Sequence, residues 1–244
     1  MIKKLFLFPL FTLLCLGTTT GVTLADVSFP SQIMYRVVVA GKNIGSAQLR
    51  FNRRSKYAGI YAVNLSNFEG LGIKSDEQMF TYVDQADLSL SSAFVSKGKK
   101  RIYEIKTVER EDLDLTKRRA YAYKEAGAKG SIDTMIYSDH KVIDLLSSFL
   151  VFSEKVRNHN LKSEKFNLWL DKSTKIVDLV HKGNESVVYK GAKVKTTVLS
   201  LKYDAVELFK FNIYGEKGYY FPVKVSIESD DKGLVEFVAD TIIP

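Results

Sequence analysis

The sequence has little of what most catalytic and metal-binding sites need. It contains one cysteine, Cys15, three histidines and one tryptophan. A single cysteine cannot form an internal disulfide, and a zinc site built from several cysteines is excluded. His140 and His159 are predicted to lie at the two ends of one helix, about 28 Å apart, so they cannot share a metal ion. We therefore expect neither a metal site nor a cofactor.

Catalytic motifs are lacking as well. The sequence has no Gly-x-Ser-x-Gly elbow, no phosphate-binding loop and no dinucleotide fingerprint. Its densest carboxylate group, at 109–114, lacks the spacing of a calcium loop and is predicted to be a charged turn. We expect that the protein is not an enzyme. An enzyme acting on envelope glycans is the alternative, and it would need two convergent carboxylates in a cleft.

The one long apolar run, residues 5–17, lies near the N-terminus. It directly follows Met1, Ile2, Lys3 and Lys4. It is shorter than the roughly 20 residues that a membrane-spanning helix needs. A positive start, an apolar stretch and small residues before the cleavage position are typical of a secretory signal peptide. We predict a signal peptide at 1–25, export to the periplasm, and a mature chain, 26–244, without cysteine and without a transmembrane segment.

Positive charge is in excess. The formal net charge is +8, and removal of Lys3 and Lys4 with the signal peptide lowers it to +6. Two basic clusters, at 97–101 and 117–119, are either solvated hairpin ends or sites that attract anionic head groups. Nucleic acid is not an expected partner in an exported protein.

One segment, 138–158, has a helical pattern in a chain that otherwise reads as strands. Ser138 or Asp139 is its predicted N-cap, and Asn158 is predicted to end it in a left-handed conformation. An apolar arc this wide must be covered, and only sheet is available to cover it. The apolar residues on that half of the helical wheel are Val142, Ile143, Leu145, Leu146, Phe149, Leu150, Phe152 and Val156.

The remaining mature chain is predicted to form about a dozen strands joined by short turns. One such turn is Gly183-Asn184, between strands at 176–181 and 187–190. Because strands both precede and follow the helix, the pattern indicates a single mainly β (α+β) domain with a largely antiparallel sheet. Several strands are apolar on both faces, which favours a curved sheet or half-barrel with the helix packed on its concave side.

Three segments resemble parts of an exported bacterial family, the domain of unknown function 3108 family. Residues 35–47 resemble its opening hairpin, 144–149 its central helix motif, and 220–225 with 233–235 its closing hairpin. Residues 214–217 depart from the family's Trp-x-x-Asp lead-in. The resemblance implies no established activity. It implies a shape similar to the half-barrel of periplasmic lipoprotein carriers, where a curved sheet and a helical lid hold acyl chains.

These observations leave three hypotheses for function. The first is binding of a hydrophobic or anionic amphipathic (lipid-like) ligand in the concavity of the sheet. The second is a non-catalytic interaction or structural module in cell-envelope biogenesis, with an envelope protein as partner. The third is the glycan-acting enzyme. The first needs an empty concavity and the second a filled one. The predicted ligand-contacting residues are Leu145, Leu146, Phe149, Phe152 and Trp169.

Overall fold

The described residues of this computed structural model form fifteen strands and one helix, α1 (Leu145–Arg157). The description covers residues 29–54, 57–63, 77–84, 88–97, 100–108, 119–127, 130–170, 173–229 and 233–244. The strands are β1 (Gln32–Val39), β2 (Lys42–Arg54), β3 (Tyr57–Val63), β4 (Glu77–Asp84), β5 (Leu90–Lys97), β6 (Lys100–Val108), β7 (Arg119–Gly127), β8 (Gly130–Ser138), β9 (Lys141–Ile143), β10 (Glu164–Leu170), β11 (Ser173–Tyr189), β12 (Ala192–Tyr203), β13 (Val206–Glu216), β14 (Tyr219–Ser229) and β15 (Gly233–Ile243).

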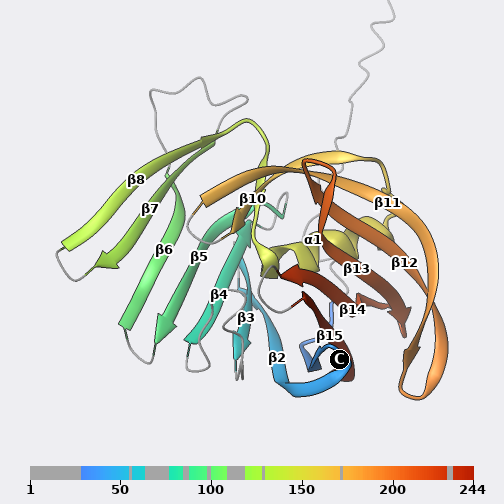
Figure 1. The fold of residues 1–244 in the computed structure, drawn as a ribbon. Helices are drawn as coiled ribbons and strands as arrows, with labels where there is room; N and C mark the ends of the chain where they lie inside the picture. Colours follow the sequence, from blue (N-terminus) through green and yellow to red (C-terminus); the bar gives the residue numbers. More distant parts are fainter. Residues whose placement is uncertain are drawn as a thin grey trace, which may run out of the picture.

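All these strands belong to one sheet, in the order β8-β7-β6-β5-β4-β3-β2-β1-β15-β14-β13-β12-β11-β10-β9. Two meanders, β1 to β8 and β10 to β15, are joined where the first strand pairs with the last. Only β9 and β10 are parallel among the described pairs, and α1 forms the connection between them. The predicted class, a mainly β protein with a largely antiparallel sheet and one packed helix, is confirmed (Figure 1).

One end of the sheet folds back onto the first meander. β8 and β9 are the outermost strands, yet only Asp139 and His140 separate them in the sequence. β9 lies next to β5, and an apolar cluster, which we call the seam, links β9 and β10 to β5 and β6. The sheet is therefore rolled, while β7 and β8 extend away from α1 (Figure 1). The seam residues are Leu90, Ala93, Ile105, Val142 and Trp169.

The seam lies on the concave side of the sheet. Ala93 of β5 is opposite Thr81 of β4, whose hydroxyl reaches the start of α1. Strand β10 is consequently buried on both faces. Phe166 belongs to the core around α1, and Trp169, on the other face, belongs to the seam. β10 is therefore a strand that is covered by apolar packing on both sides.

The helix begins later than predicted. Asp144 is the N-cap, and its side chain accepts a hydrogen bond from the Ser147 amide at 2.7 Å while the Ser147 hydroxyl accepts one from the Asp144 amide at 2.8 Å. The predicted caps, Ser138 and Asp139, are wrong because Lys141–Ile143 is strand β9, which pairs with β10. The apolar residues whose spacing predicted one helix thus belong to two elements, strand β9 and helix α1.

The helix ends at the predicted place by a different geometry. Asn158 is the C-cap, but its φ is −88°, and the following residue, His159, is left-handed with a φ of +53°. The Asn158 amide donates to the Glu154 carbonyl at 2.9 Å. Lys155 and Arg157 occupy the last turn, where cations are favoured by the helix dipole.

The predicted turn at Gly183-Asn184 is wrong. β11 runs through it as one strand, and the register with β12 shifts between His181 and Gly183. Gly183 has a φ of +93°, which marks a bulge that bends the strand rather than a reversal of the chain. A glycine is typical of both a turn and a bulge. The sequence therefore predicted two strands where the structure has one long strand.

Candidate functional site

The centre of the candidate site is the region of the concave side of the sheet against which α1 packs. Three of the predicted ligand-contacting residues, Leu146, Phe149 and Phe152, are buried there together, and Leu145 is partly exposed at its margin. The Phe149 ring packs edge-on against Phe211 at 5.7 Å between centroids, and Phe152 packs against the same ring at 5.0 Å. These faces of the helix are therefore in contact with the protein's own side chains.

Further ring contacts fix the same side chains. Phe149 also lies edge-on to Tyr35 at 5.9 Å, and Phe152 to Phe166 at 5.9 Å. The Tyr35 hydroxyl donates to the Pro222 carbonyl at 2.8 Å, so even the polar atom of this core tyrosine is satisfied. Edge-to-face pairs of this kind contribute about 0.5–1.5 kcal/mol each beyond burial.

Trp169 is separate from the other predicted residues. It is buried in the seam, with Val142 of β9, Leu90 of β5 and Ile105 of β6, and does not belong to the core around α1. The structure thus brings Leu146, Phe149 and Phe152 together and places Trp169 in another cluster. A role in ligand binding stays a prediction for all five residues.

Asp144 is the most unusual side chain around α1. It is fully buried, and the Thr81 hydroxyl of β4 donates to its Oδ2 atom. Burial raises the pKa of the Asp144 carboxyl, and the hydrogen bonds from Thr81 and Ser147 offset part of that rise. The spacing Asp144-x-x-Ser147 resembles a capping box, which was the available signal. Nothing in the sequence indicated Thr81.

Glu154, an acid within α1, is also buried. Its Oε2 atom lies 3.1 Å from Nε of Arg157 and accepts a hydrogen bond from Nδ2 of Asn158 at 3.4 Å. The Ser153 hydroxyl donates back to the Phe149 carbonyl at 2.6 Å. The Ser153 hydroxyl and Oε2 of Glu154 thus find partners within the last turns of the helix.

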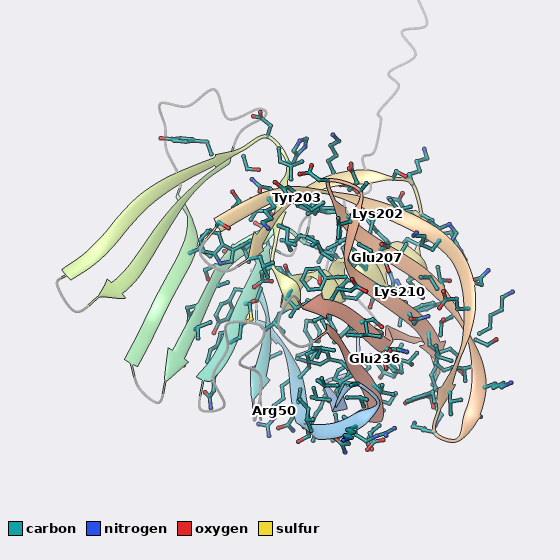
Figure 2. The ribbon with its side chains drawn as sticks, in the orientation of Figure 1. Arg50, Lys202, Tyr203, Glu207, Lys210 and Glu236 are labelled. Carbon is teal, nitrogen blue, oxygen red and sulfur yellow. The ribbon has the colours of Figure 1, made fainter. Side chains whose placement is uncertain are left out.

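The outer face of β11 to β15 carries cross-strand charge pairs. Nζ of Lys210 lies 2.7 Å from Oε1 of Glu185, and Nζ of Lys224 is paired with Glu236. Lys210 and Glu236 are labelled in Figure 2. The hydrogen bond from Lys210 lowers the pKa of the Glu185 carboxyl. Exposed pairs of this kind contribute little stability each. They describe a charged face whose paired side chains are partly exposed to solvent.

Tyr189, at the end of β11, packs against the rings of Tyr214 and Phe221. Burial raises the pKa of the Tyr35 phenol well above its ordinary value and also raises that of Tyr189. Nζ of Lys190 lies 4.9 Å from the centroid of the Tyr189 ring and 3.5 Å from Oε1 of Glu216. Because both phenols hold their protons more tightly than usual, neither is suited to act as a general base.

The remaining candidates are scattered or fall outside the described residues. His140 follows β8, His159 follows α1, and His181 lies in β11. In the described ranges, no group of three or more His, Cys, Asp or Glu residues could hold a metal ion. The predicted signal peptide, the carboxylates at 109–114 and part of each basic cluster lie outside the described residues. The helix that is described is not long and apolar enough to cross a membrane.

Comparison with known proteins adds little. No family model matches the chain, and no curated protein matches it. Among solved structures, the chain is similar to the crystal structure of a DUF1329 family protein from Desulfovibrio piger ATCC 29098. The two share 9% identity over 90% of this chain and 88% of the other, with a TM-score of 0.23. The neighbour belongs to a family of unknown function, and so low a score supports no transfer of fold or role.

Proposed function

We propose that this protein is an exported, non-catalytic interaction module of the cell envelope, in which α1 is a permanent part of the core. One observation carries the proposal: every residue of α1 from 146 to 154 is buried, on the apolar and the polar side alike. A helix enclosed on all sides fills the space in which a carrier would hold its ligand. The working surface of such a module is its exterior.

Export to the periplasm and membership of the domain of unknown function 3108 family are part of this proposal. They rest on the N-terminal segment and on the three resembling segments of the sequence. Fusion of residues 1–30 to alkaline phosphatase, which is active only after export, tests the first. Activity of the fusion is expected, and an inactive, uncleaved fusion would contradict the predicted signal peptide.

Hydrogen exchange tests whether α1 is permanent. If it is core, its slowest amides exchange only through global unfolding, with the same opening free energy as the central strands β13 and β14. Mass spectrometry of solvent extracts from the purified protein is then expected to find no stoichiometric lipid. Opening of α1 at a much lower free energy than β13, together with a co-purified lipid, would overturn the module and support a carrier.

A carrier for a lipid-like ligand is the second candidate, with α1 as a movable lid. Its support is that α1 carries two buried acids, Asp144 and Glu154, whose desolvation is relieved if the helix leaves its seat. The ligand's chain would then replace Leu146, Phe149 and Phe152. Titration with a fluorescent fatty acid separates the two functions: saturable binding that speeds exchange in α1 supports the carrier, and no binding supports the module.

A further inference from the structure

We propose that β8 pairs with β8 of a second copy of this chain, forming a two-fold dimer with one continuous sheet. The inference does not depend on the proposed function, because a module and a carrier can equally be dimeric. It begins from the two outermost strands of the sheet. β9 is three residues long and lies against β5, whereas β8 is nine residues long and pairs along its whole length with β7.

Among the described strands, β8 has no second neighbour. An outermost strand presents a row of backbone N–H and C=O groups to any strand that can align with it. Proteins that remain monomeric usually blunt such edges with lysine, proline, bulges or very short strands. β8 has no lysine and no proline, its pairing with β7 shows no bulge, and its one charge is Asp133. Of these protective features, β8 therefore carries only the single charge of Asp133.

The sequence of β8 is complementary to itself. In an antiparallel pair centred on Thr134, Ile132 is opposite the partner's Ile136, and the reverse pair repeats the contact. Asp133 is opposite a methionine, so no like charges meet. A pair centred one residue earlier would place Asp133 opposite Asp133, which is unfavourable. The favoured register therefore joins apolar to apolar positions and keeps the two acids apart.

The register of β8 with β7 and of β7 with β6 also favours a dimer axis at Thr134. Thr134 is opposite Tyr123 of β7, which is opposite Ile105 of β6. Ile105 is fully buried on the concave side, in the seam. The row that contains Thr134 is thus the continuation of a core row, and pairing across the two-fold axis extends that row into the second copy.

The rolled sheet also limits the assembly to two copies. Because β9 is enclosed against β5, it offers no edge that a neighbouring β8 could use in a head-to-tail chain. Each copy then has one edge of useful length, and pairing of identical edges closes after two copies instead of growing into a filament.

Cysteine crosslinking tests the register directly. In a Cys15→Ser background, Thr134→Cys places one thiol on each side of the axis, within the roughly 4.5–5.5 Å between Cα atoms of opposite residues that a disulfide tolerates. Mild oxidation is expected to give a covalent dimer. The matched control, Ser131→Cys, lies about 20 Å from its own copy in this register and is expected to remain uncrosslinked.

Light scattering on the purified full chain gives the independent measurement. The wild type is expected to be a dimer, and Thr134→Lys, which brings two cations face to face, a folded monomer by circular dichroism. Val188→Lys, at a side chain that is 61% exposed on β11, is the control and should stay dimeric. A wild type that is monomeric at every concentration overturns the proposal. So does crosslinking of Ser131→Cys as readily as Thr134→Cys.

Discussion

Asp144 joins the helix to the sheet through a single carboxylate. Oδ1 accepts from the Ser147 amide inside α1, and Oδ2 accepts from the Thr81 hydroxyl on β4. The group is fully buried, so its charge has no water to replace these partners. The orientation of the first helical turn against β4 therefore depends on one titratable side chain.

A comparison of Asp144→Asn with the wild type should reveal how the titration of Asp144 affects stability. Burial holds the pKa of folded Asp144 above its ordinary 3.8, so the folded protein binds this proton more readily than the unfolded chain does. Stability from this group is therefore present at low pH and lost as pH rises through the folded pKa. Urea unfolding between about pH 4 and about pH 7 should show the wild type losing stability relative to Asp144→Asn. A difference that is constant with pH would contradict the raised pKa.

Phe152 gives the sharpest measure of packing around α1. It is fully buried and contacts both Phe166 and Phe211. Phe152→Ala is expected to lower the free energy of unfolding by about 3–5 kcal/mol, because it leaves a cavity in a closed core. Leu145→Ala, on the partly exposed margin of the same helix, should cost clearly less. Equal small losses in urea unfolding would show that the helix is only loosely held.

Among the secondary-structure elements, the boundary between β9 and α1 shows the limit of local patterns. Val142 and Ile143 continue the helical spacing of Leu146 and Phe149, so periodicity assigns all four to one helix. Their actual state is decided by pairing with β10, more than 20 residues later, which no local pattern reveals. The existence of the helix, its last turn and its burial against the sheet were all predictable. Its first turn was not.

The bulge of β11 leads to a prediction about one backbone position, Gly183. A Cβ at Gly183 would meet no atom within 4 Å, so substitution there is opposed only by the φ of +93°. Gly183→Ala is expected to destabilise the protein by about 1–2 kcal/mol through backbone strain. Ser186→Ala, three residues later on the exposed part of the strand, should be nearly neutral. If thermal unfolding finds the two variants equal, the bulge does not hold the left-handed conformation.

For the molecule as a whole, composition was enough to predict strands around a helix, but not the rolling of the sheet. Rolling depends on contacts of Trp169, in β10, with Leu90 of β5 and Ile105 of β6. In the sequence, each of these is simply an apolar residue of a strand. This is also why Trp169 was grouped with the helix residues as a candidate ligand contact: its aromatic character was visible, but its neighbours were not.

The seam makes Trp169 a reporter of cooperativity. It is the only tryptophan of the chain, and its side chain is buried in the seam, between β10 and strands β5 and β6. If the rolled sheet folds as one domain, tryptophan fluorescence and circular dichroism should give coincident urea transitions. Leu90→Ala, a fully buried change on the β5 side of the seam, should shift both transitions together by about 2–5 kcal/mol. A fluorescence transition that precedes the loss of strand signal would instead mean that the seam opens first, and that the strands beyond it unfold as a separate unit.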